Sequence, residues 1–290
     1  MKNMIKYYYG LDIDTIIEKD NNYKLIIDGT NYLLSRCNKI DLLNILKYID
    51  KYNFHTIVNT IGNDITIPIN SYDYVLLKLK KTYKKISIED IYDFNFPLYI
   101  KNDSINRWIS LWSSHIDYIE YQINELSNKY PILAKYVYYY IGLTETAIEF
   151  LKTIDNNSYE YIAHRRINSD MTLVDLYNPV NLVIDSKVRD ISEYYKNMFF
   201  NNDDSNIINE IKESIRYFNE SELKLFLARM LYPTYFFDIY DDILEHDLSD
   251  DRLYNIINKS DEYEILLKEL YMSIKKATPI ENIEWLIQLR

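Results

Sequence analysis

The pattern of apolar residues changes once along this chain, near residue 100. Residues 1–80 alternate apolar and polar side chains in short runs, the period of two that is typical of half-buried strands. From residue 104 onward, apolar side chains recur every three or four positions, as on one face of a helix. The sequence therefore predicts an α+β protein with a small β-rich domain over 1–80, a linker over 81–103 and a mostly helical domain over 104–290.

The first region carries a strong hairpin signal. Asp28-Gly29 separates two runs rich in β-formers, and such a pair favours a tight two-residue turn. We expect residues 7–25 to form the first strands and residues 39–52 to form one helix, with Asp41 as its N-cap. Three further short strands are expected between residues 54 and 81.

The second region opens with a long amphipathic helix over residues 104–130, in which Trp108 and Trp112 face the core. Residues 130–154 are expected to form two helices with a break at Gly142. The stretch 161–190 is expected to be a loop and hairpin embedded in this domain.

Within that embedded stretch, two β-like runs lie around residues 172–176 and 181–184, and the chain beyond Asp190 is almost wholly helical in pattern. Asp190 is expected to cap the helix that follows it.

The composition excludes several classes of function. Acidic residues outnumber Lys and Arg by 44 to 33, for a net charge of −11, which argues against a nucleic-acid partner. Cys37 is the single cysteine and cannot form an internal disulfide. No apolar run approaches the roughly 18 residues that span a bilayer, and no charged-then-apolar leader opens the chain. We expect neither a membrane span nor a signal peptide.

Residues 164–185 are laid out like the catalytic segment of a phosphoryl-transfer enzyme. Such enzymes place an Asp two residues after a His, as the base, and an Asn five residues further on, as a magnesium ligand. After His164 these two positions hold Arg166 and Met171. An Arg cannot accept a proton, and a thioether is a poor ligand for Mg²⁺. Asp170 is the nearest carboxylate that could replace either group, and we expect His164 itself to be packed and hydrogen-bonded under the loop.

Asp185 is the one residue in this stretch that is suited to a metal ion. It ends an apolar run, where strand-end carboxylates face a cleft, but one carboxylate binds Mg²⁺ only weakly without further ligands. The alternative is that Asp185 forms an ion pair with Arg165, Arg166 or Arg189, and we favour this pairing.

The phosphate-binding elements of a kinase are missing from the first region. A kinase needs a glycine-rich turn and a Lys on its third strand. Here the first strands contain only Gly10, and the third strand reads Tyr-Leu-Leu-Ser over 32–35, with no cation before Arg36. Lys78 and Lys80 are expected on a later strand, as solvated edge charges.

These features, taken in order, resemble a known family. Seven segments resemble successive parts of the aminoglycoside-phosphotransferase-type kinase fold, in its spore-coat branch of CotS/YutH-like proteins. They are "TNYLLSRC", "TIVNTIGNDITIPINSYDYVLLKL", "RWISLWSSHIDYIEYQI", "YYYIGLTETAIEFL", "HRRI", "VIDSKVRDISEYY" and "ARMLYPTYFFDIY". The resemblance implies a two-lobed protein-kinase-like fold with a small β-rich N-lobe and a larger helical C-lobe. Thr146 stands where that branch has Asn.

The resemblance also implies a function and a setting. It points to a kinase-like protein of a spore-forming, low-GC bacterium, located in the cytoplasm or the spore coat, with coat proteins as partners. Because Arg166 and Met171 replace the catalytic groups, we expect a pseudokinase that acts as a scaffold and needs no cofactor. Two alternatives stay open: a small-molecule phosphotransferase that uses ATP, with Asp185 for Mg²⁺ and Asp170 as base, and a protein that binds a nucleotide or small ligand without turnover.

Overall fold

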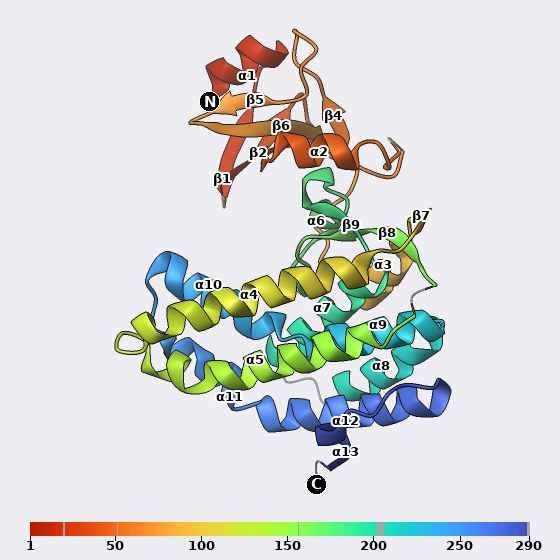
Figure 1. Ribbon diagram of the computed structural model, residues 1–290. Coiled ribbons are helices and arrows are strands. Elements are labelled where there is room, and N and C mark those ends of the chain that lie inside the picture. The colour runs from red at the N-terminus through yellow and green to blue at the C-terminus, as the bar shows by residue number, and fades with distance from the viewer. Residues whose placement is uncertain (20, 51, 156, 202–205, 289–290) are drawn as a thin grey trace. The chain divides into compact units, whose positions relative to one another are not determined.

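The computed structural model describes residues 1–19, 21–50, 52–155, 157–201 and 206–288 (Figure 1). The chain forms two compact units, the first from residues 1–87 with 170–184 and the second from residues 88–169 with 185–290. The sequence places the whole of 161–190 in the helical domain, whereas the contacts of 170–184 group it with the β-rich unit. The first unit is therefore built from two separate stretches of chain.

The first unit is organised around one antiparallel sheet, with strand order β1-β2-β3-β6-β4 and with β5 also pairing with β6 (Figure 1). Its strands are β1 (Thr15–Lys19), β2 (Asn22–Ile27), β3 (Thr30–Cys37), β4 (Thr56–Val58), β5 (Ile67–Ile69) and β6 (Tyr72–Lys78). The predicted hairpin is confirmed: β2 and β3 are joined by Asp28 and Gly29, whose φ angles of 48° and 70° are both left-handed. A turn with two positive φ angles is what the Asp-Gly pair favours.

The first unit has an unexpected helix, α1 (Lys2–Tyr9), in part of the region where the sequence predicts strands. Ile5 and Tyr9, four residues apart, lie on the same helical face and are buried together with Leu25 and Leu34 from the sheet. The three consecutive tyrosines suggest a strand by propensity, but in a strand Tyr7 would share the face of Ile5 and Tyr9, whereas it is 77% exposed, as a helical period requires. Gly10 ends the helix with a left-handed φ of 68°.

The opposite face of the sheet packs on α2 (Lys39–Ile45). Val174 and Val180, from the second stretch of this unit, join the same apolar cluster as Leu33 and Leu77. The cap prediction for α2 is wrong: Asn38 is the N-cap, and its side-chain oxygen accepts hydrogen bonds from the amides of Ile40 and Asp41.

The second stretch of this unit is mostly helical. The prediction of a β-like run at 172–176 is wrong, because Leu173–Leu176 forms a short helix, α6. Thr172 and Asp175 form a reciprocal capping box at its start, and this local hydrogen bonding outweighs the β-propensity of Thr and Val. The later run is a strand as predicted, β9 (Leu182–Asp185), preceded by η1 (Pro179–Asn181).

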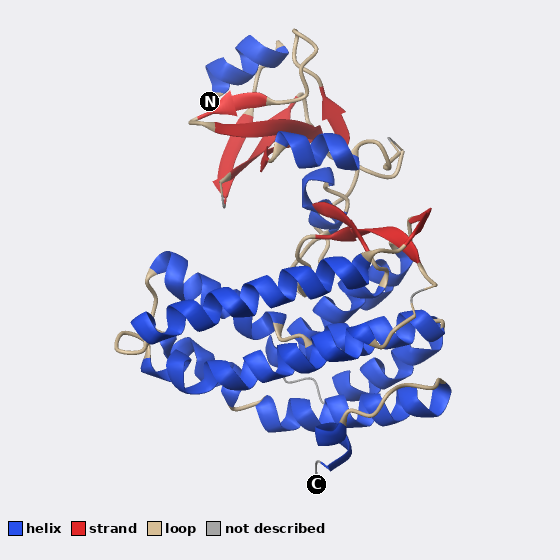
Figure 2. Cartoon of the chain, in the orientation of Figure 1, coloured by secondary structure: helices blue, strands red, loops and turns tan. Residues whose placement is uncertain are grey.

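The second unit is dominated by helices (Figure 2). They are α3 (Ile88–Asp93), α4 (Ser104–Leu126), α5 (Pro131–Lys152), α7 (Val188–Asn201), α8 (Ile207–Glu213), η2 (Ser214–Tyr217), α9 (Glu220–Leu231), α10 (Thr234–His246), η3 (Asp250–Leu253), α11 (Tyr254–Ile257), α12 (Ser260–Ala277) and α13 (Glu284–Gln288). Two strands, β7 (Pro97–Lys101) and β8 (Tyr159–His164), pair antiparallel. In the part of the chain that is described, no helix is both long and apolar enough to cross a membrane.

The long helix α4 confirms its prediction, and Trp108 and Trp112 are both buried in its core-facing stripe. The expected break at Gly142 is wrong, because α5 continues through that residue. A helical glycine costs only about 1 kcal/mol relative to alanine, and α5 offsets this cost by burying residues on both sides of Gly142 against α4 and α9.

Candidate functional site

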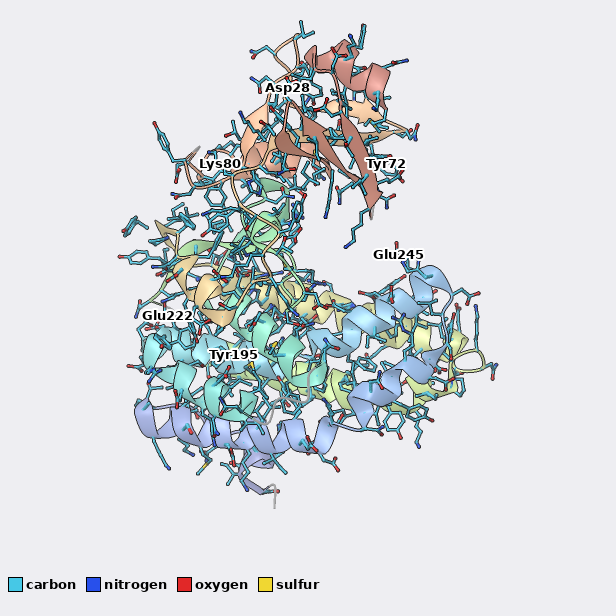
Figure 3. The ribbon with its side chains drawn as sticks, turned by 180° about the vertical axis from the view of Figure 1, so that it is seen from behind. Asp28, Tyr72, Lys80, Tyr195, Glu222 and Glu245 are labelled. Atoms are coloured by element: carbon cyan, nitrogen blue, oxygen red, sulfur yellow. The ribbon has the colours of Figure 1, made fainter. Side chains whose placement is uncertain are left out.

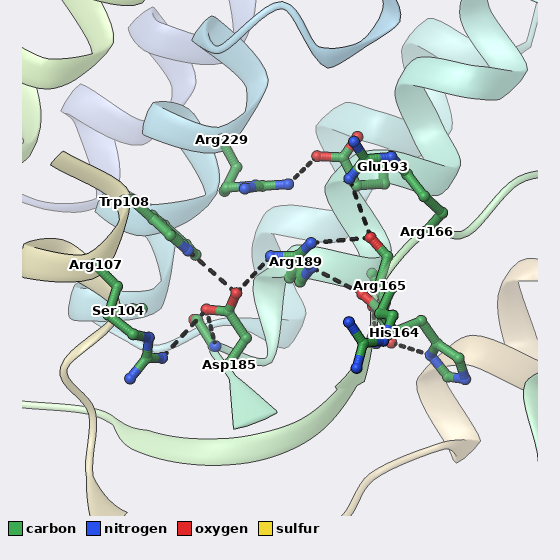
Figure 4. A network of polar contacts seen from close by, with 12 residues as sticks. Ser104, Arg107, Trp108, His164, Arg165, Arg166, Asp185, Arg189, Glu193 and Arg229 are labelled. Atoms are coloured by element: carbon green, nitrogen blue, oxygen red, sulfur yellow. Dashed lines mark hydrogen bonds and ion pairs between the residues drawn. The ribbon is translucent and has the colours of Figure 1, made fainter. Parts of the chain in front are cut away.

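Asp185 lies at the end of β9, and its carboxylate is engaged by neighbouring donors (Figure 4). Its side chain is only 6% exposed. One oxygen, Oδ2, accepts hydrogen bonds from Arg189 Nη1 at 2.6 Å and from Trp108 Nε1 at 3.2 Å. The other, Oδ1, accepts from the Ser186 amide at 2.7 Å. Both oxygens are therefore used by groups of the protein itself.

A second arginine adds positive charge on the other side of Asp185. Arg107 Nη2 lies 3.7 Å from Asp185 Oδ1. The same guanidinium binds Glu160 through two hydrogen bonds, of 2.8 and 3.1 Å. Burial alone would lower the pKa of Arg107, but the facing Glu160 carboxylate raises it. Two arginines and two carboxylates thus form a neutral, largely buried cluster.

Arg189 is held in place by more than the carboxylate. Its Nε donates to the His164 carbonyl at 2.8 Å, and its Nη2 donates to the Arg165 carbonyl at 2.9 Å. The side chain is 14% exposed. All three nitrogens of the guanidinium have acceptors, so Arg189 ties β9 and α7 to the loop that follows β8. Of the three arginines that the sequence interpretation offered as partners of Asp185, Arg189 forms the ion pair. Arg107 is a further partner that was not predicted.

His164 is buried beneath this loop, at 1% exposure. Its Nδ1 donates to Asp190 Oδ2 at 2.6 Å, its amide donates to Asp190 Oδ1 at 2.9 Å, and its ring packs on Phe94. The predicted capping role of Asp190 is wrong: α7 begins at Val188, and the Asp190 carboxylate is used by His164 instead. The pair fixes the end of β8 to the first turn of α7.

Arg166 and Asp170 lie in different units. The Arg166 side chain is 61% exposed and forms an ion pair of 2.9 Å with Asp238 on α10. The Asp170 side chain is 89% exposed and lies 2.9 Å from Lys85 within the first unit. The Met171 carbonyl accepts from the Ile86 amide, so Asp170 and Met171 both contact the segment at residues 85–86.

The third strand carries no lysine. In β3, Leu33 and Leu34 point to opposite faces of the sheet and are buried in its two apolar clusters. Arg36 stacks on the ring of Tyr72 at 3.3 Å from the centroid. Of the two later lysines, Lys78 ends β6, while Lys80 lies beyond the strand, a correction to its predicted place.

The residues around Asp185 do not fit a magnesium ion. Mg²⁺ needs near-octahedral oxygen ligands. Here Asp185 faces two guanidinium groups, and the described ranges contain no cluster of three or more His, Cys, Asp or Glu that could hold a metal ion. A cation at this carboxylate would have to displace Arg189.

A second polar cluster, which the sequence reasoning missed, lies next to the first. Lys196 is 1% exposed, and its ammonium group donates to Glu193 at 2.9 Å and to the carbonyls of Arg229 and Tyr232 at 2.9 and 3.0 Å. Glu193 also contacts Arg229 and the hydroxyl of Thr234. Burial alone would raise the pKa of Glu193, but the two cations lower it below its usual range. The spacing of Glu193 and Lys196, three apart on α7, was the only sequence signal for this cluster.

The two polar clusters meet at a stack of aromatic rings. The Arg229 guanidinium lies 5.0 Å from the Trp108 ring centroid, and Trp108 stacks on Trp112, which stacks on Tyr232 at 4.1 Å. Trp108 also donates to Asp185, so a chain of contacts runs from Glu193 through Arg229 and Trp108 to that carboxylate.

Together, these features define a protein of the aminoglycoside phosphotransferase-like fold. An aminoglycoside phosphotransferase from Alicyclobacillus acidocaldarius subsp. acidocaldarius is similar over 95% of this chain and 97% of its own, with a TM-score of 0.59 at 12% identity. A spectinomycin phosphotransferase, APH(9)-Ia, solved with ADP and spectinomycin, covers 94% of this chain and 97% of its own, with a TM-score of 0.48 at 10% identity.

The first of these likenesses establishes the fold alone, since the identity is low. No curated protein matches the chain. The family is established by sequence: residues 2–270 match the family described as "Spore coat putative kinase YutH". The chain belongs to that family.

Proposed function

We propose that this protein is a kinase-like protein without phosphotransfer activity, which serves spore coat assembly by binding other coat proteins. Membership of a spore coat family supports the setting. The observation that carries the loss of activity is the state of Asp185, whose two oxygens are taken by Arg189, Trp108 and the Ser186 amide.

The energetics of Asp185 oppose metal binding. Separating a buried carboxylate from its guanidinium partner typically costs about 3–5 kcal/mol, because it leaves a charge buried without compensation. Mg²⁺ would have to repay this cost at a site where Arg189 and Arg107 also repel it. The ion pair is therefore the stable state of this carboxylate.

The position of the expected base supports the same proposal. Arg166 is permanently cationic, so it cannot take a proton from an attacking hydroxyl. Its ion pair with Asp238 directs the side chain towards α10. Asp170, the relocated base of the alternative enzyme hypothesis, is exposed and paired with Lys85.

The first test is a thermal melt with and without millimolar ATP and Mg²⁺, combined with an assay for phosphate release and transfer. A ligand at about 100 times its Kd stabilises the folded state by roughly 2.7 kcal/mol, which shifts a melt measurably. We expect no shift and no transfer. The variants are Asp185→Asn and Asp170→Asn, the two carboxylates of the alternative enzyme hypothesis, with Asp117→Asn on the exposed face of α4 as the control.

Three outcomes are informative. A shift with transfer that Asp185→Asn abolishes would refute the proposal in favour of an enzyme. A shift without transfer would replace the scaffold by a nucleotide-binding protein. If neither appears, the coat role is tested in the sporulating host: deletion should change the protein composition of the coat, and an Asp170→Asn allele should restore it. An unchanged coat in the deletion strain would refute the scaffold role.

A further inference from the structure

One residue of the second unit has a strained backbone. Tyr99, in β7, has a φ of 54°, in the left-handed region that bulky side chains disfavour. The other described residues with a positive φ, apart from glycines, are asparagines, aspartates and one serine. Asn and Asp adopt this region readily because their short polar side chains form local hydrogen bonds. An aromatic residue lacks that compensation, so the fold holds Tyr99 in an unfavourable conformation.

The strain at Tyr99 is not offset by burial. The Tyr99 side chain is 78% exposed, so it contributes little to the core of the second unit. Its conformation comes from a bulge in the pairing of β7 with β8, where the stretch 97–101 faces the shorter stretch 159–161 (Figure 1). Strain kept at an exposed residue is typical of binding sites, where contact with a ligand offsets it.

The bulge places Tyr99 against a second exposed tyrosine. The rings of Tyr99 and Tyr159 meet edge to face, with centroids 5.9 Å apart and planes at 65°. Tyr159 is 50% exposed, so two aromatic rings lie together at the surface of one hairpin. Other tyrosine pairs, such as Tyr139 with Tyr140, have one ring in the core. We call Tyr99 and Tyr159 the tyrosine platform.

The tyrosine platform is held by its neighbours. Burial raises the pKa of Tyr161 in β8, and the carboxylate of Glu222, near the start of α9, raises it further (Figure 3). Asn102 is buried, donates through Nδ2 to the Tyr159 carbonyl at 3.0 Å and accepts at Oδ1 from the Ser104 amide at 2.7 Å. These contacts fix β8 to α9 and to the start of α4, so binding at the platform loses little conformational freedom.

A polar cavity of about 340 Å³ adjoins the tyrosine platform. It is lined by Lys101 at the end of β7, by Asp103 and Asn106 around the start of α4, and by Asp155 after α5. Lys101 and Tyr159 are opposite one another in the hairpin, so their side chains lie on the same face. The cavity therefore begins beside the platform, and its size lies in the range of roughly 300–1,000 Å³ that is typical of ligand sites.

The polar groups of this cavity include both donors and acceptors. Lys101 only donates, the ionised carboxylates of Asp103 and Asp155 only accept, and the Asn106 amide does both. Within the described ranges, the side chains of Lys101 and Asp155 have no hydrogen-bond or ion-pair partner, so both are available to a ligand. A ligand that meets all these groups must itself donate and accept, as hydroxyl groups do.

We infer that this surface binds an oligosaccharide chain, with one sugar unit in the cavity and the next on the tyrosine platform. A pyranose unit has hydroxyl groups around its edge, which donate and accept, and C–H faces that pack on aromatic rings. An extended peptide is a poorer partner, because the bulge at Tyr99 disrupts the regular backbone edge that strand addition to β7 needs. This inference does not depend on the lack of phosphotransfer activity.

Binding is measured on the full chain by isothermal titration and by saturation-transfer NMR, which also detects weak complexes. The probes are chitohexaose and cellohexaose, their monosaccharides N-acetylglucosamine and glucose, and a proline-rich peptide as a ligand of another class. We expect a hexasaccharide to bind about tenfold more tightly than its monosaccharide, because a single unit cannot occupy the cavity and the platform together. The peptide should not bind.

Two substitutions separate binding from folding. Tyr99→Gly removes the ring and relieves the strained φ, so we expect a Tm no lower than that of the parent and hexasaccharide binding that is about tenfold weaker. Asp155→Ala removes an acceptor of the cavity whose side chain has no partner among the described residues, and it should weaken binding at an unchanged Tm. The control is Tyr121→Ala, at an exposed tyrosine of α4, which should bind like the parent.

The inference is overturned if neither hexasaccharide binds, or if a monosaccharide binds as tightly as its hexasaccharide. Binding that is unchanged in Tyr99→Gly or in Asp155→Ala would also overturn it, as would a control that is impaired as much as Tyr99→Gly. A lower Tm in Tyr99→Gly would show that Tyr99 serves the fold and not a ligand. Binding of the peptide in place of the saccharides would assign the platform to a protein partner.

Discussion

A neutral His55 ring uses both of its nitrogens to hold parts of the first unit together, and one of the two bonds reaches the second stretch of this unit. Its Nε2 donates to the Val174 carbonyl at 3.0 Å, and its Nδ1 accepts from the Lys80 amide at 3.2 Å. The side chain is 3% exposed, and burial lowers the pKa of His55 to about 4 from its ordinary 6.5. Protonation would remove the acceptor that the Lys80 amide needs, so the ring has to stay neutral in the folded unit.

The sign and size of the pH effect follow from these two pKa values. Between pH 6.5 and 4 the unfolded chain binds a proton that the folded chain does not, so the free energy of unfolding falls as the pH falls. Each pKa unit corresponds to about 1.4 kcal/mol. The contribution of His55 is complete above pH 6.5, and about 2 kcal/mol is lost at pH 5 and about 3 kcal/mol at pH 4.

The assay is hydrogen exchange measured by mass spectrometry, on peptides from β4 and β6, between pH 4 and 7 after correction for the intrinsic rates. The variant His55→Gln keeps one donor and one acceptor but does not titrate in this range. We expect it to be less stable than the parent at pH 7, with a difference that shrinks by about 3 kcal/mol towards pH 4. His246→Gln, at an exposed histidine of the second unit, is the control.

The result that would refute this reasoning is a constant difference between His55→Gln and the parent across the whole pH range. Such a result would mean that the pKa of His55 is the same in the folded and the unfolded chain. A pH dependence in the parent that His246→Gln removes would assign the effect to a different histidine.

Three further predictions concern stability. Arg189→Met should lower the free energy of unfolding by about 3–5 kcal/mol, since it leaves Asp185 buried without its closest cation. The loss should be smaller in the double variant Arg189→Met/Asp185→Asn. Urea unfolding measures both losses, and equal losses would contradict the pairing. Gly29→Ala should cost about 1 kcal/mol in a thermal melt, because its φ of 70° disfavours a side chain; no loss would contradict the turn geometry. Asn38→Ala should cost about 1 kcal/mol through the lost cap of α2, whereas Asp41→Ala should cost less; the reverse order in urea unfolding would restore Asp41 as the cap.

Much of the fold could be predicted from the sequence where local signals and burial agree. The Asp28-Gly29 hairpin has a turn and flanking runs that favour the same geometry, and α4 has an unbroken apolar stripe through Trp108 and Trp112. The wrong predictions of secondary structure lie where a local signal and burial disagree. Gly142 weakens a helix locally, but α5 is buried on several sides, and tertiary packing outweighs the local cost.

The candidate site was predictable only in part, because some of its contacts join residues that are far apart in the sequence. Arg189 was named as one possible partner of Asp185, and their separation of four residues could have singled it out among the three arginines. Arg107 and Glu160 are 78 and 25 residues away from Asp185 in the sequence, and no spacing rule connects them. Contacts of this kind arise from the packing of α4 beside β8, which local patterns do not encode.

Arg166 and Asp185 differ in how many contacts would change if each were to serve phosphoryl transfer. Replacing Arg166 by Asp would restore a carboxylate on an exposed loop, at the cost of one ion pair to Asp238. Asp185 is different, because its carboxylate balances two guanidinium groups, and Arg189 also holds the carbonyls of His164 and Arg165. Freeing Asp185 for a cation would therefore dismantle the loop that positions residue 166. If the protein lacks phosphotransfer activity as proposed, we expect Arg166→Asp alone to leave it inactive, because Asp185 would still be held by Arg189 and Arg107.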